Sequence, residues 1–140
     1  MKNKGFTLIE LLAVIVILAI IALIATPMIL GVIDTAKRGS AESSALGYVE
    51  SVEKSIMLQQ VKGGAALAAG TYYVNTDGDL ASGSATGTKA LDVDFKGAVP
   101  TGTVVVGTDS SVTSATLTFA SIHANEVSYS GATGKATIAS

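Results

Sequence analysis

The first feature of the hydrophobic pattern is a long apolar run near the N-terminus. Residues 11–25 are all apolar, and the run continues with few interruptions to Asp34. A segment of about 20 apolar residues is long enough to cross a bilayer as a helix. Glu10, at the start of the run, is its one charged residue, although a carboxylate at the bilayer centre costs roughly 3 kcal/mol and less near the interface. A plain membrane anchor therefore leaves Glu10 unexplained.

After Asp34 the pattern changes to that of an amphipathic helix. Apolar residues recur at spacings of three and four, which place them on one helical face: Leu46, Val49, Val52 and Ile56. We interpret this stripe as a core face and the Gly63-Gly64 pair as the end of the helix. The two segments together predict one long helix from Phe6 to about Lys62. It should be kinked near Pro27, since a proline removes a backbone donor and clashes with the preceding turn.

The C-terminal part of the chain has the pattern of short strands joined by turns. Residues 103–106 are β-branched throughout, and the alternation after Val112 places Ala115, Leu117 and Phe119 on one face. Residues 101–140 therefore predict an antiparallel sheet of three or four strands, with its apolar face on the helical stripe. Region 63–100, rich in Ala, Gly, Ser and Thr, is expected to be mainly loop. Within it, residues 71–74 form a short strand or a packed loop, and residues 91–95 an edge strand or a connection.

Length and composition fit one small domain on a helical stalk. The chain has 140 residues, and the predicted fold class is α+β, a helical spine with a small antiparallel sheet on its C-terminal half. The net charge is −2 and no basic cluster occurs, which argues against nucleic acid as an intrinsic ligand. Cysteine is absent, so packing must stabilise a head that a disulfide often reinforces in small extracellular folds.

The sequence has no clear pattern of catalytic or cofactor-binding residues. Its single histidine, His123, lies in a predicted turn without an obvious acid or nucleophile partner, and no phosphate loop or zinc spacing occurs. Residues 75–79, Asn-Thr-Asp-Gly-Asp, hint at a calcium loop. The EF-hand template requires Gly at position six, where this chain has Leu80, so a turn is favoured. We therefore expect neither an enzyme nor a cofactor or metal site.

Basic residues precede the apolar run. Lys2 and Lys4 form a short basic head, and positive charge of this kind keeps a flank in the cytoplasm. A secretory signal has a small-residue cleavage site after its apolar segment, and none follows this longer run. Composition alone therefore indicates an uncleaved signal anchor with its N-terminus in the cytoplasm.

The hexapeptide from Gly5 to Glu10, Gly-Phe-Thr-Leu-Ile-Glu, resembles the class III signal of type IV prepilins. In that family a prepilin peptidase cuts after the glycine and methylates the new N-terminal residue. The resemblance implies a leader at residues 1–5, a cut between Gly5 and Phe6, and N-methylphenylalanine at Phe6. The short leader and the absence of cysteine look most like pilins of Gram-positive bacteria such as clostridia.

The resemblance also implies roles for the two parts of the helix. Residues 6–33 would span the membrane in the precursor and form the core of a filament, and residues 34–62 would be the amphipathic helix of the head domain. Cleavage leaves an amine on Phe6, which a neighbouring subunit, shifted axially, could present to Glu10. This pair would neutralise two charges in an apolar core. The alternative is that Glu10 only reaches toward the lipid headgroups.

The implied function is structural. The chain would be the major subunit of a type IV pilus, a homo-oligomeric helical filament that serves adhesion, twitching motility, biofilm formation or DNA uptake. A pilus assembly platform with ATPase motors would supply the work, because a bilayer and a filament core are both apolar. The precursor would be a single-pass protein of the inner (cytoplasmic) membrane with a cytoplasmic N-terminus, and the assembled pilus would be extracellular.

Two other functions fit the same pattern. One is a pseudopilin of a type II secretion or competence system, which shares the N-terminal signal and forms a short fibre. Tight calcium binding around Asp77 and Asp79 would favour it. The other is a monomeric membrane-anchored binding module, which predicts an uncleaved Met1 and tolerance of Glu10→Ala.

Overall fold

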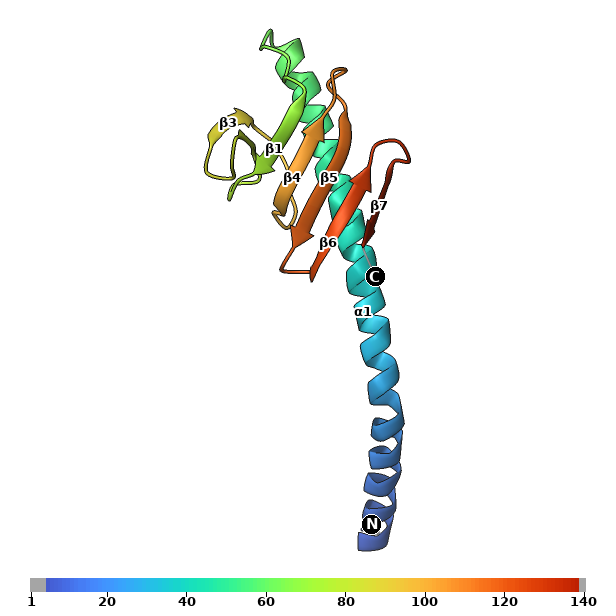
Figure 1. The fold of residues 1–140 in the computed structure, drawn as a ribbon. Helices are drawn as coiled ribbons and strands as arrows, with labels where there is room; N and C mark the ends of the chain where they lie inside the picture. The colour runs from blue at the N-terminus through green and yellow to red at the C-terminus, as the bar shows by residue number, and fades with distance from the viewer. Residues whose placement is uncertain (1–4, 139–140) are drawn as a thin grey trace. The chain divides into compact units, whose positions relative to one another are not determined.

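The computed structural model describes residues 5–138 of the chain (Figure 1), so the basic residues of the predicted leader, Lys2 and Lys4, lie outside the described part. One helix and seven strands follow in order: α1 (Leu8–Val61), β1 (Gly70–Val74), β2 (Leu80–Ser82), β3 (Thr88–Leu91), β4 (Thr101–Val106), β5 (Val112–Phe119), β6 (His123–Ser130) and β7 (Lys135–Ile138). The chain divides into two compact units, Met1–Ala36 and Lys37–Ser140. The helix α1 thus contributes its first part to one unit and its second part to the other.

The first unit consists of the apolar part of α1. Its large hydrophobic side chains between Leu8 and Ile33 are 45–86% exposed. The helix contains a segment long and apolar enough to cross a membrane, and none of that segment is buried inside the protein. Many of its residues are Val and Ile, which are weak helix formers in water. In an apolar medium, however, every backbone group must be paired within the segment, and this requirement favours the helix.

The proline in this part does not end the helix. α1 continues through Pro27, although the missing N–H leaves the Leu23 carbonyl without the donor of a regular turn. Beside it, the Thr26 hydroxyl donates to the Ala22 carbonyl at 2.6 Å, a contact that often accompanies helix bending. The kink predicted near Pro27 stays a prediction.

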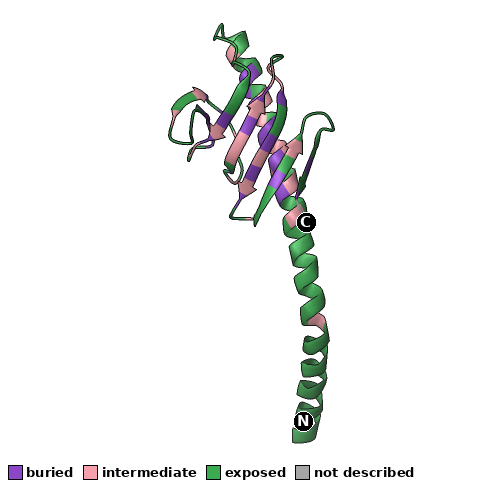
Figure 2. Cartoon of the chain, viewed as in Figure 1, coloured by how far each residue is buried: buried purple, intermediate pink, exposed green. Residues whose placement is uncertain are grey.

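In the second unit α1 packs on an antiparallel sheet (Figure 2). Of the predicted stripe, Val49, Val52 and Ile56 are buried, whereas Leu46 is only partly buried. The predicted α+β fold class is therefore confirmed. The full buried set on the helix adds small and polar residues to the stripe: Ala41, Ala45, Tyr48, Val49, Val52, Ser55 and Ile56.

All seven strands form one antiparallel sheet in the order β3-β2-β1-β4-β5-β6-β7. The predicted number of three or four strands is wrong. Strands β4 to β7 lie within residues 101–140, but β1, β2 and β3 lie in region 63–100, which the sequence predicts to be mainly loop. These three strands have only five, three and four residues. They form because β1 pairs along β4, with Tyr72 opposite Val104, and a strand depends on its partners more than on its own residues.

The core lies between the sheet and the second part of α1. On β5, Ala115, Leu117 and Phe119 are buried, as the alternation predicts. Residues 92–95 follow β3 without strand structure. Within them Val93 is buried, and the Phe95 ring packs edge-on against that of Tyr48, with centroids 5.3 Å apart.

Two carboxylates on α1 hold backbone donors of the sheet. Glu53 Oε1 accepts a hydrogen bond from Val112 N, and Glu42 Oε1 accepts one from Ile138 N, both at 3.1 Å. A charged acceptor makes such bonds stronger than neutral ones. They attach the helix to the first residue of β5 and to the last strand, positions that lie far from it in sequence.

Candidate processing and assembly site

The predicted cut lies in an open segment before the helix. Gly5, Phe6 and Thr7 have no regular secondary structure, and α1 begins at Leu8. A Cβ at Gly5 would meet no atom within 4 Å, and Phe6 is 82% exposed. Proteases preferentially cleave exposed segments that contain small residues. Because the fold itself leaves room for a side chain at position 5, any requirement for glycine there comes from the peptidase.

Thr7 and Glu10 form a capping box at the first turn of α1. The backbone N and Oγ1 of Thr7 both donate to Glu10 Oε2, at 2.9 and 2.7 Å. The backbone N of Glu10 in turn approaches Thr7 Oγ1 at 3.4 Å. This reciprocal arrangement supplies partners for N–H groups that a helix start otherwise leaves unpaired. The carboxylate also lies at the positive end of the helix dipole.

Thr7 is a residue of the candidate site that the sequence motif did not single out. The signal for it was present, since Thr-x-x-Glu directly before an apolar run is the sequence pattern of a capping box. The structure thus brings Gly5, Phe6, Thr7 and Glu10 together in one short segment. Within the described residues, however, the Glu10 carboxylate bonds to Thr7 and makes no hydrogen bond to Phe6. Pairing of Glu10 with a Phe6 amine remains a prediction about two copies of the chain.

The sequence of this segment matches a known family model. Residues 1–26 match the model described as the prokaryotic N-terminal methylation motif. The match supports a type IV pilin-like prepilin signal. It implies processing by a prepilin peptidase and assembly into pilus-like oligomers, as for a type IV pilin-like protein or a pseudopilin. The match ends before the head, and comparisons with curated proteins and with solved structures give no match.

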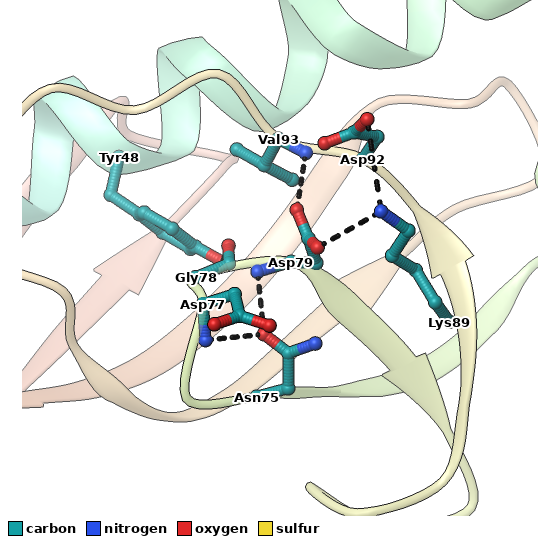
Figure 3. Close-up of polar contacts among 8 residues, drawn as sticks. All are labelled: Tyr48, Asn75, Asp77, Gly78, Asp79, Lys89, Asp92 and Val93. Carbon is teal, nitrogen blue, oxygen red and sulfur yellow. Dashed lines mark hydrogen bonds and ion pairs between the residues drawn. The ribbon is translucent and has the colours of Figure 1, made fainter.

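The loop at residues 75–79, the other candidate site in the sequence, forms the turn between β1 and β2 (Figure 3). Asn75 Oδ1 accepts hydrogen bonds from the backbone N of Asp77 and of Asp79, both at 2.9 Å. Tyr48, buried on α1, donates its hydroxyl to the Gly78 carbonyl at 2.7 Å. The side chains therefore tie this turn to itself and to the helix.

Asp79 points from this turn into the protein and is 7% exposed (Figure 3). Its Oδ1 accepts a hydrogen bond from Val93 N at 2.9 Å, and its Oδ2 lies 3.2 Å from Lys89 Nζ. Lys89 Nζ also lies 3.7 Å from Asp92. The chain itself thus engages both oxygens of Asp79. In residues 5–138 no group of three or more His, Asp or Glu side chains is arranged to hold a metal ion.

The surroundings of Asp79 favour its charged form. Burial alone would raise the pKa of Asp79, but the Val93 N–H and the Lys89 ammonium outweigh this effect and bring it below the ordinary value of 3.8. The same carboxylate raises the pKa of Lys89. Asp79 is therefore a buried charge with a matched partner, and loss of that partner would leave the charge uncompensated.

Replacement of Gly5 by Leu should block the cut. The fold has room for the side chain, so the variant should enter the membrane and fold as the wild type does. We expect intact-mass analysis after co-expression with a prepilin peptidase to find only full-length chain. Gly31→Leu, another replacement at a position with open space, should still be cleaved. Efficient cleavage of Gly5→Leu would show that the peptidase does not read this glycine.

Replacement of Asp79 by Asn should destabilise the head by about 1–2 kcal/mol at neutral pH, because a hydrogen-bonded charge partner of Lys89 is lost. Since folding lowers the pKa of Asp79 from 3.8, its stabilisation is present above that value and disappears as the pH falls through the folded pKa.

Unfolding of the processed chain in detergent, followed by circular dichroism, checks both points. The difference between wild type and Asp79→Asn should shrink between about pH 5 and about pH 2. Asp77→Asn, which removes an exposed carboxylate of the same turn, should have little effect. A difference between wild type and Asp79→Asn that stays constant over this range would contradict the assignment of the charge.

Proposed function

We propose that the chain is the major structural subunit of a type IV pilus and polymerises through the apolar part of α1. The observation that carries the proposal is the unburied surface between Leu8 and Ile33, where every large hydrophobic side chain is at least 45% exposed. The match to the N-terminal methylation motif, residues 1–26, includes most of this surface. Proteins that are monomers in water rarely expose so large a contiguous apolar surface. A bilayer would cover it before assembly, and the same helices of other copies would cover it afterwards.

Glu10 favours a filament over a plain anchor. Thr7 satisfies hydrogen bonds of the Glu10 carboxylate but brings no positive charge. After the cut, Phe6 of a second copy, shifted along the helix axis, would offer an amine to this carboxylate. A neutralised pair costs far less in apolar surroundings than an isolated charge. A monomeric anchor also contains the contact between Thr7 and Glu10, but it provides no positive partner for the carboxylate charge.

The proposed filament needs other proteins for its assembly. Transfer of the apolar helix from lipid to a filament core gains little from the hydrophobic effect, because both surroundings are apolar. Helix packing and the Phe6–Glu10 pair supply part of the free energy. A platform protein with ATPase motors would supply the rest, after a prepilin peptidase has exposed and methylated Phe6. The precursor would lie in the cytoplasmic membrane with its N-terminus inside, and the pilus would lie outside the cell.

A pseudopilin shares the N-terminal signal, and the turn at residues 75–79 helps to distinguish the two. Calcium at this turn would favour a pseudopilin, and Asp79 would be its buried carboxylate. Both oxygens of Asp79 are instead engaged by Val93 N and Lys89. A calcium ion would have to displace an ammonium that already balances the charge. This contact supports a pilin over a calcium-dependent pseudopilin.

Glu10→Gln should be cut, methylated and kept in the membrane, yet form no filaments. The amide has nearly the length of the carboxylate and can still bond to Thr7, but it cannot neutralise an amine. Sheared fractions and membranes would be compared by immunoblot and electron microscopy. Glu50→Gln, an exposed position on the same helix, should assemble normally. Filaments of ordinary length from Glu10→Gln would rule out charge pairing as the basis of assembly.

A further inference from the structure

The two oxygens of the Glu10 carboxylate have different surroundings. Oε2 accepts both donors of Thr7, the backbone N at 2.9 Å and the hydroxyl at 2.7 Å. Across the described part of the chain, Oε1 makes no hydrogen bond. One oxygen is thus anchored to the start of the helix, and the other is open. A carboxylate has about four acceptor positions, so the anchored group can still bind another donor.

Without this anchor, Glu10 would sample several rotamers on the outside of the helix. Immobilising a flexible side chain on association weakens binding, because its rotamer freedom is lost. The short contact between Thr7 Oγ1 and Glu10 has the length of a strong charge-assisted bond. In an apolar medium, where water does not compete, such a contact holds the carboxylate firmly. In the free chain the Glu10 side chain is therefore already held in one conformation, so less rotamer freedom is lost when a partner binds.

We propose that Thr7 is a positioning residue for assembly, which anchors Glu10 through Oε2 and thereby presents Oε1 to the Phe6 amine of a second copy. This role rests on the proposed function, in which that amine is the partner of Glu10. Thr7 does not contact the second copy in this arrangement. It acts through the carboxylate, by holding it hydrogen-bonded and fixed in direction.

The anchor is independent of the cut. Both of its donors belong to Thr7, which lies on the mature side of the Gly5–Phe6 bond. The peptidase therefore changes only the donor of the pair, because it converts the Phe6 amide into an amine. The acceptor is already set in the precursor. Processing thus creates the amine of the pair, and Thr7 orients its carboxylate. A change at Thr7 should therefore reduce assembly but leave membrane anchoring and processing unchanged.

Three single variants test the hydroxyl of Thr7. Thr7→Val keeps the shape of the side chain but loses the hydroxyl donor, whereas Thr7→Ser keeps it. Thr26→Val is the matched control, since its hydroxyl lies in the same apolar helix but bonds to the Ala22 carbonyl. The measured quantity is the amount of sheared filament per processed, methylated subunit, which separates assembly from cleavage. Loss of a cap contact lowers the equilibrium constant for the anchored state about fivefold, so we expect a reduction of up to about fivefold for Thr7→Val.

Thr7→Ser and Thr26→Val should both remain close to wild type. The inference is overturned if Thr7→Val assembles as well as wild type, or if Thr7→Ser fails as Thr7→Val does. It is also overturned if Thr26→Val is equally defective, since any hydroxyl in the helix would then have the same effect.

A second measurement distinguishes failure of this inference from failure of the proposed function. Amide exchange at Thr7 is followed in the full processed chain in detergent micelles, where no filament is needed. Glu10→Ala removes the acceptor of the Thr7 N–H and should speed exchange there about fivefold, while Glu10→Gln should retain protection. Equal exchange in wild type and Glu10→Ala would refute the anchor itself. A protected Thr7 amide in a wild-type chain that forms no filaments would instead refute the pilus function and, with it, the role of the anchor in assembly.

Discussion

Between Leu8 and Ile33 the chain forms a helix whose large hydrophobic side chains are all exposed. The environment that covers this surface determines which polar groups the chain must pair by itself. Water is a poor environment for it, so a bilayer or other helices must cover it. In either case backbone and side-chain polar groups have no water to bond with. The capping box at Thr7 and Glu10 and the contact of Thr26 with the Ala22 carbonyl meet this requirement within the chain. In the described part of this segment the Glu10 carboxylate still lacks an opposite charge, and the Leu23 carbonyl lacks its regular helical donor because of Pro27.

The head meets the same requirement with contacts between distant residues. Glu42 and Glu53 accept backbone hydrogen bonds from the sheet, and Asp79 pairs with Lys89 and Val93 N. Across the described residues, no buried side-chain nitrogen or oxygen lacks a hydrogen-bond partner. Buried polar side chains of the head thus find their partners within one chain, whereas in the described residues the Glu10 carboxylate contacts Thr7 and no positive group.

Parts of this structure were predictable because their signals are local. The spacing of Val49, Val52 and Ile56 predicts the buried helical face, and the alternation through Leu117 and Phe119 predicts the sheet. Strands β2 and β3 were missed, and for residues 71–74 of β1 the sequence allows either a short strand or a packed loop. Strands of three to five residues carry too little periodicity and depend on their partners in the sheet. Tyr48 escaped the apolar pattern because its hydroxyl needs a buried acceptor, which only the folded turn supplies at Gly78.

The candidate site divides in the same way. Gly5, Phe6 and Glu10 belong to one contiguous motif, so the resemblance was enough to select them. Thr7 carries a local signal that becomes meaningful once the helix start is known. The pairing of Asp79 could not be inferred, since Lys89 lies on another strand and a run of Asn, Asp and Gly ordinarily indicates a solvated turn.

The most direct test of the account is the intact mass and N-terminal sequence of material sheared from cells. The account predicts a chain that begins at Phe6 and is heavier by one methyl group, present as the main component of surface filaments. A chain that begins at Met1 and is found only in membranes would contradict it, because the apolar helix would then serve as an anchor. A processed, methylated chain that never reaches the sheared fraction would contradict the claim that the chain forms filaments on the cell surface, and it would favour a pseudopilin.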